Sequence, residues 1–182
     1  SNQGGKYLAV NSNADAIEFV GASQSNQVLE MIGGQCDGES ITTLNGDTIE
    51  LGGSGGITVY QALTTTYADV SGSSITYQPP SGTEFVEYEF DFAYRYHDSY
   101  PRFSFKFFID NTEVTNARTA PGMGYQNTGE FIFKQIIMIG TDDVSNSKVD
   151  SWTSTKTLKL QAREGTSANE GYLHRHRYFY ED

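Results

Sequence analysis

The sequence predicts an all-β fold, an antiparallel β-sandwich of jelly-roll type with a short β-rich N-terminal extension. Several stretches alternate apolar and polar residues with a period of two, which is the pattern of half-buried strands. Turn residues separate these stretches, with 19 Gly in 182 residues, and 12 Tyr and 11 Phe supply a bulky core. No stretch keeps a helical period over three turns, so we expect fewer than about a tenth of the residues to be helical.

The central stretch runs from Glu84 to Asp110. Its first half alternates between aromatic and charged residues, and after the break at residues 97–101 a second alternating segment follows. The predicted inward face comprises Val86, Tyr88, Phe90, Phe92, Tyr94, Tyr96, Phe103, Phe105, Phe107 and Ile109. The opposite face of the first segment carries an acidic row, Glu87, Glu89 and Asp91.

Three expectations follow for these two segments. A strand over residues 84–96 would span about 43 Å, longer than an ordinary strand, so we expect a bend or a bulge. Since the segments are consecutive, we expect them to pair as antiparallel neighbours. Lys106 would then lie on the polar face beside the acidic row.

Residues 1–56 differ from the rest and form a predicted fibre-like or docking segment, while residues 57–182 form the predicted sandwich domain. Short strand-like runs occur at 7–10, 17–20 and 28–32, and Asn45-Gly46 predicts a hairpin over 41–51. Residues 52–56 are mostly glycine and predict a flexible linker. The runs are too short to fold alone, so they must pack either on the sandwich or on neighbouring chains.

Four parts of the chain carry a family resemblance. They are Gly5 to Asn11 followed by Ile17-Glu18-Phe19, then Ile32 to Gly38, Leu63 to Thr83, and Phe107 to Asp110 with Glu113-Val114. In this order they resemble virion structural proteins of marine bacteriophages, of the tail-fibre, appendage or capsid-decoration type. The resemblance covers about residues 4–115. It implies a trimeric β-rich virion module and transfers no catalytic residue.

Within the sandwich, short strands are predicted at 57–63, 67–70 and 74–78, and Pro79-Pro80-Ser81-Gly82 must be a turn because proline cannot donate to a ladder. Asp110-Asn111-Thr112 predicts a hairpin tip. Residues 116–129 lack an apolar period and predict a long loop, which is either a recognition loop, an idle connection or a subunit contact.

Residues 131–139 are apolar on both faces except at Lys134 and Gln135. Such a strand is either covered on both sides within the chain or meets another subunit. Asp142-Asp143 follows as a solvated loop. Leu158, Leu160 and Ala162 then indicate another half-buried strand.

The last predicted strand, 172–180, places four side chains on one face as a candidate subunit-contact stripe: His174, His176, Tyr178 and Tyr180. We expect this stripe to face the acidic row, which would raise the histidine pKa values above about 6.5. Two alternatives stay open. The imidazoles are neutral and buried, or they bind a metal, for which His97 is the only further histidine and no third ligand is identifiable.

Composition excludes several partners. The formal charge is −11, and Lys6 is the only basic residue before Arg95, so nucleic acid and anionic lipid are disfavoured. No apolar run is long enough to cross a membrane as a helix. One cysteine, Cys36, rules out an intrachain disulfide and is expected to be a small buried hydrophobe, with a reactive thiol or interchain link as the alternative. Ser1 in place of an initiator methionine indicates a piece of a longer protein.

The sequence contains no enzyme motif: no G-x-S-x-G, no phosphate-binding glycine loop and no H-E-x-x-H. Glu87 and Glu89 have the spacing of glycosidase carboxylates, but alternation on an exposed strand face explains them without catalysis. We therefore expect no enzyme activity, no cofactor and no metal.

Two function classes remain. The first is a homotrimeric virion module that binds other virion proteins and contacts a host-surface glycan; the second is a carbohydrate-binding jelly-roll module of a larger secreted protein. Five residues are candidates for surface recognition in either class: Tyr96, His97, Tyr100, Arg102 and Tyr125. The N-terminal segment favours the first class, with the virion as its location.

Overall fold

A computed structural model of the chain describes residues 6–10 and 17–21 as backbone, and residues 27–53, 56–96, 102–121, 128–165 and 171–175 with their side chains. This part of the chain is nearly all β, and its one helical element is the 3₁₀ turn η1, Val144–Asn146. Within it, no helix is long and apolar enough to cross a membrane. The predicted all-β class is confirmed.

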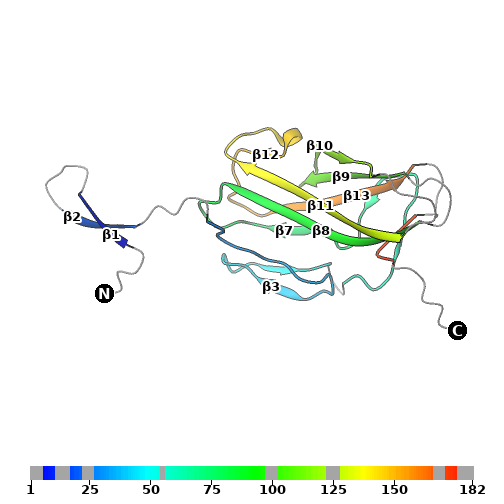
Figure 1. Cartoon of the computed structure of the whole chain (residues 1–182), viewed down its shortest axis with the longest axis horizontal. Helices are drawn as coiled ribbons and strands as arrows, with labels where there is room; N and C mark the ends of the chain where they lie inside the picture. Colours follow the sequence, from blue (N-terminus) through cyan, green and yellow to red (C-terminus); the bar gives the residue numbers. More distant parts are fainter. Residues whose placement is uncertain are drawn as a thin grey trace.

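Two five-stranded sheets form the body (Figure 1). The first has the order β10-β9-β13-β6, with β7 also paired to β13, and the second has the order β12-β11-β8-β14-β5. The strands of the first sheet are β6 (Ala68–Asp69), β7 (Ile75–Tyr77), β9 (Phe103–Ile109), β10 (Thr112–Thr119) and β13 (Lys156–Glu164). Those of the second are β5 (Gln61–Ala62), β8 (Phe85–Tyr96), β11 (Thr128–Ile139), β12 (Lys148–Val149) and β14 (Gly171–Leu173).

The strand pairs are nested along the chain. β9 pairs with β10, β8 with β11, β6 and β7 with β13, and β5 with β14, all antiparallel. This is one long hairpin rolled into two layers, with the pairs β9–β13 and β8–β14 closing each sheet. Such a double-sheet roll is a jelly roll. The parallel contact of β11 with β12 is the exception.

Aromatic rings from the two sheets meet between the layers. Phe103, Phe105 and Phe107 of β9 are fully buried, because each alternate residue of the strand points to the same side. Their rings lie against β8, with centroid distances of 5.1 Å for Tyr88–Phe107 and 5.6 Å for Phe92–Phe105. The predicted inward face is therefore the core.

The expected pairing of β8 with β9 is wrong, since these strands belong to different sheets and face each other. For the same reason Lys106 does not join the acidic row. It lies on the outer face of the other sheet, where its Nζ is 3.0 Å from Glu113 Oε2.

The expected bulge in the long strand is also wrong. β8 pairs with β11 in constant register from Phe85↔Met138 to Arg95↔Thr128. A partner of equal length lets the strand stay regular throughout. The register shift lies elsewhere, between Val114 and Thr119 of β10.

The N-terminal segment contains two hairpins. β1 (Lys6–Val10) pairs with β2 (Ile17–Gly21) as a separate sheet, and β3 (Ser40–Thr42) pairs with β4 (Thr48–Glu50) around the predicted Asn45-Gly46 turn. Residues of the second hairpin dock on the chain's own sandwich. Ile49 is 4% exposed within the core, and Asn45 Nδ2 donates to the carbonyls of Gln78 and Pro79. The domain division at residue 56 stays a prediction.

The expected flexible linker does not hold for Gly52 and Gly56, which pack closely on the backbone of Cys36 and Asp37. Gly52 has a φ of +79°, and a Cβ atom at this position would lie 2.7 Å from Cys36 O. Glycine is therefore required by close backbone packing. Cys36 itself is half-buried, and burial raises the pKa of its thiol.

Two further boundaries differ from the sequence expectations. β10 continues to Thr119 and buries Ala117, and β11 begins at Thr128, so residues 116–119 and 128–129 of the predicted loop belong to strands. β14 ends at Leu173, because His174 has a φ of +61° and leaves the extended conformation. The turns at 79–82 and 110–111 are as predicted.

We predict that Phe107→Ala lowers the free energy of unfolding by about 3–5 kcal/mol, because a fully buried ring leaves a cavity between the sheets. Leu44→Ala truncates an apolar side chain that is 70% exposed and should cost less than about 1 kcal/mol. Urea unfolding at one fixed protein concentration measures both. Equal losses would contradict the described core.

Candidate functional site

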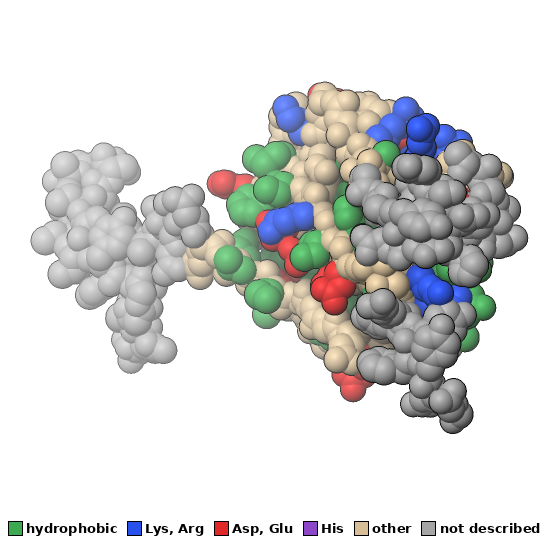
Figure 2. Space-filling view, turned by 45° about the vertical axis from the view of Figure 1, so that its right-hand side comes forward, with side chains coloured by type: hydrophobic (Ala, Val, Ile, Leu, Met, Phe, Trp, Pro, Cys, Tyr) green, Lys and Arg blue, Asp and Glu red, His purple; other side chains and the backbone are tan. Residues whose placement is uncertain are grey.

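The outer face of β8 and β11 exposes large apolar side chains. Ile132 is 56% exposed and Phe85 54%, while Ile136 and Met138 are each 46% exposed. Phe133 and Ile137 of the same strand are buried, because alternate residues point to opposite faces. Figure 2 shows hydrophobic side chains gathered on one part of the surface, with acidic and basic side chains among them. We call the four exposed residues the outer apolar patch.

Lys134 lies within this patch and neutralises part of the acidic row. Its Nζ is 2.8 Å from Glu87 Oε1 and 3.5 Å from Glu89 Oε2, both on the neighbouring strand β8. The hydrogen bond to Glu87 raises the pKa of Lys134. The acidic row thus takes its described cationic partner from β11.

The strand 131–139 is apolar on both faces, as the sequence indicates. Its inner face packs in the core, and its outer face is exposed, so the described chain does not cover both sides. Contact with another subunit, the other alternative, stays a prediction. Phe85 was not singled out by the sequence, although it is in phase with Glu87 and Glu89 and that phase indicates the outer face.

Among the candidate recognition residues, Tyr96 lies on the inward face that the alternation predicts, so its choice as a surface residue is wrong. It is 2% exposed, and its hydroxyl lies 3.4 Å from Glu164 Oε1 inside the core, so it cannot stack on a sugar. Its inward direction follows from sharing the phase of Phe90 and Phe92. Arg102 is exposed as expected. His97, Tyr100 and Tyr125 lie outside the described residues.

The His174 side chain does not face the acidic row. Its ring lies 5.9 Å from that of Phe92 and 6.2 Å from that of Phe90, on the core side of β8. Burial lowers its pKa below the usual 6.5, and a hydrogen bond with the Ser71 backbone opposes the shift in part. The expected rise is therefore wrong, because the ring is buried beside Phe90 and Phe92 and does not face the acidic row. His176, Tyr178 and Tyr180 lie outside the described residues.

The opposite outer face carries an aromatic–cation cluster that the sequence did not reveal. Lys106 Nζ lies 4.4 Å and Arg163 Cζ 4.9 Å from the ring centroid of Tyr67. Glu113 accepts hydrogen bonds from Arg118 and Lys106, and these lower the pKa of its carboxyl group. Lys106, Arg163 and Arg118 are thus bound to Tyr67 or Glu113 of the same chain.

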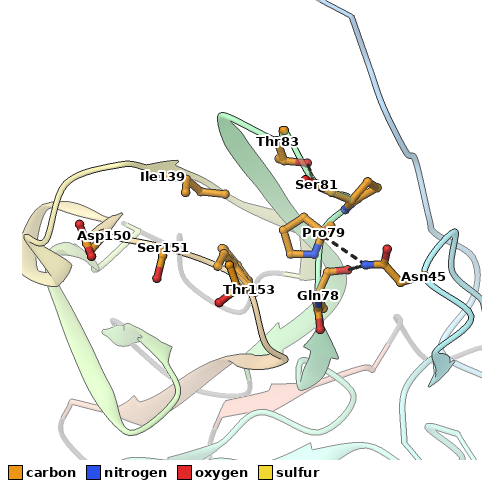
Figure 3. A pocket seen from close by; sticks show the side chains of 12 residues that line it. Asn45, Gln78, Pro79, Ser81, Thr83, Ile139, Asp150, Ser151 and Thr153 are labelled. Atoms are coloured by element: carbon orange, nitrogen blue, oxygen red, sulfur yellow. Dashed lines mark hydrogen bonds between the residues drawn. The ribbon is translucent and has the colours of Figure 1, made fainter.

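A surface pocket of about 290 Å³ lies between the 78–83 turn, the hairpin tip at Asn45 and residues 150–153 (Figure 3). Trp152 lines it but is 5% exposed, and its Nε1 donates to Tyr77 O at 2.9 Å, so the indole serves the core. Asp150 is the one ionisable side chain in the lining. The pocket therefore has no pair of groups for acid–base work. In the described part of the chain, no three His, Cys, Asp or Glu residues are grouped as a metal site would require.

Comparison with known proteins gives little. No family model matches the sequence, and no curated protein matches it. Among solved structures, a chain of infectious bursal disease virus, Gx strain, aligns with a TM-score of 0.38 and 10% identity over 95% of this chain and 39% of that one. A chain of the Gt strain aligns with a TM-score of 0.29 and 11% identity over 73% and 38%. This chain thus spans well under half of either, and neither likeness carries an argument about function.

We predict that acid weakens the fold through His174. Because its folded pKa is lowered, the unfolded chain binds a proton in the window just below pH 6.5 where the folded chain does not. The stabilising contribution of the neutral ring is present above that window and is lost as the pH falls through it. The free energy of unfolding of wild type minus that of His174→Gln should therefore increase from about pH 5 to about pH 7.

Ile109→Val is the control, since it destabilises the buried core without changing a titratable group. Its difference from wild type should stay constant over the same pH range. A wild-type advantage over His174→Gln that shrinks with rising pH would restore the acidic-row arrangement.

Proposed function

We propose that this chain is a non-enzymatic structural module of a virion, a trimeric bacteriophage appendage or capsid-decoration protein. Its resemblance to such proteins over residues 4–115 supports the virion role, and the jelly-roll body is compatible with it. Fold alone does not choose a function, because jelly rolls also serve lectins and cupins.

The outer apolar patch carries the proposal. Four large apolar side chains stand exposed on a regular two-strand surface, where the backbone is held by a constant register and the opposite face is core. Covering such a surface contributes roughly 25 cal/mol per Å² of apolar area before association costs. Assembly of identical chains into a homotrimer would bury this apolar face between subunits.

Contact with other virion proteins and with a host-surface glycan belongs to the same proposal. Arg102 is the exposed residue that remains from the predicted recognition set among those described. The absence of an enzyme motif in the sequence supports a structural role.

We predict that the protein in solution has three times the mass of the 20.1 kDa chain, or a multiple of that trimer. The double variant Phe85→Ser, Met138→Ser should lose the threefold assembly, because these residues lie opposite each other on the patch. Light scattering over a dilution series measures both.

Leu44→Ser with Val59→Ser is the matched control, since both residues are exposed apolar side chains away from the patch, and this variant should keep the wild-type mass. A wild type of 20.1 kDa at every concentration would sink the trimer. Equal loss of assembly in both double variants would remove the patch from the proposal.

A further inference from the structure

The edge of β11 that faces away from β8 is open over most of its length. On that side β12 pairs only with Met138 and Ile139, and no other described strand pairs there. Met138 N donates to Ser147 O, so its amide points away from β8. In an antiparallel ladder alternate residues point the same way. The N–H and C=O groups of Thr128, Glu130, Ile132, Lys134 and Ile136 therefore point to the open edge.

Three devices that often protect such an edge are missing from residues 128–136. Natural edges are blunted by proline, by bulges or by a lysine that reaches outward. Residues 128–136 contain no proline and no register shift. The one lysine, Lys134, is turned toward Glu87 and Glu89 on β8, away from the edge. Among the described residues, the carbonyl of Ile136 alone has a local donor, the Gln135 side chain at 3.2 Å, and it can accept a second hydrogen bond.

We infer that a second copy of this chain pairs antiparallel with this edge about a twofold axis at Ile132. β12 occupies the edge from Met138 onward, so the open stretch is 128–136 and its midpoint is residue 132. Full overlap of two identical stretches therefore places Ile132 opposite Ile132 of the second copy. A self-complementary contact of this kind is what a twofold interface requires.

Charges agree with this register independently. With the axis at Ile132, Glu130 lies opposite Lys134 of the second copy on the same exposed face, so it adds a third carboxylate near a lysine that already contacts Glu87 and Glu89 of its own chain. Sliding the strands by two residues in either direction places Glu130 opposite an isoleucine instead. Sliding by four places Lys134 opposite Lys134, or Glu130 opposite Glu130, which is unfavourable.

The result is one sheet that continues through both chains, with backbone hydrogen bonds for all five open residues of each. This pairing is made by the backbone edge of β11, whose hydrogen bonds do not depend on the proposed trimer, although the side chains of Ile132 and Ile136 also belong to the outer apolar patch. If both contacts form and the two axes meet at right angles, they close an assembly of six chains.

Cysteine cross-linking tests the register. Ile132→Cys should form a disulfide-linked dimer on mild oxidation, because facing residues in a hydrogen-bonded pair have Cα atoms about 5.5 Å apart, within disulfide reach. Ile136→Cys is the matched control on the same strand. Its equivalent in the second copy would lie about eight residues away, or about 26 Å, and should not link.

Equal parts of Thr128→Cys and Ile136→Cys should form a mixed dimer, since these positions face each other. Wild type, with Cys36 alone, gives the background. The inference is overturned if Ile132→Cys does not cross-link above that background. It is also overturned if Ile136→Cys alone cross-links as readily as Ile132→Cys. Glu130→Lys should weaken dimer association about tenfold in sedimentation, and an unchanged association would contradict the register.

The same experiments separate this contact from the proposed function. If trimers form but Ile132→Cys does not cross-link, the proposed function stands and the twofold contact is wrong. If Ile132→Cys cross-links but no threefold mass is found, the twofold contact stands and the proposed trimer is wrong.

Discussion

The packing of aromatic rings from β9 in one sheet against those of β8 and β11 in the other sheet is the interaction on which the rest of this structure depends. Phe105 stacks on Phe131 at 5.2 Å, and Phe107 lies 5.4 Å from Phe133. Buried aromatic rings of this size dominate the energetics of a core. Once their phase is fixed, every intervening residue must point outward. The positions of the acidic row, of Lys134 and of the exposed isoleucines are consequences of where the phenylalanines lie.

Much of this was readable in the sequence, because alternation reports which face a residue takes. It gave the inward aromatic face, the half-buried strand at Leu158 to Ala162 and the all-β class. Alternation does not name the partner strand. Tyr96 and Phe103 are near each other in the chain, so a hairpin was the natural expectation, yet the chain changes sheets between them. Which strands pair depends on how all the strands are arranged in the two sheets, and local alternation does not report that arrangement.

The candidate site was harder to predict for local reasons. The alternation of residues 172–180 continues through His174 without interruption. It therefore does not predict that His174 has a positive φ or that its ring turns toward Phe92. Tyr96 shows the opposite case, since its phase already assigned it to the core. The exposed face of β11 was visible as apolar residues at 132, 136 and 138, but the open backbone edge appears only when the neighbouring strands are known.

The nested order of strand pairs also governs how the protein can be made. Ala62 pairs with Tyr172, so two strands 110 residues apart must meet before the second sheet is complete. Pairings this distant in sequence are slow to form, because the entropy of closing the intervening chain is lost before the contact is gained. A ribosome that has released β8 and β11 but not β14 holds a half-built layer. During synthesis, the aromatic interior of that layer is exposed until the final strand arrives.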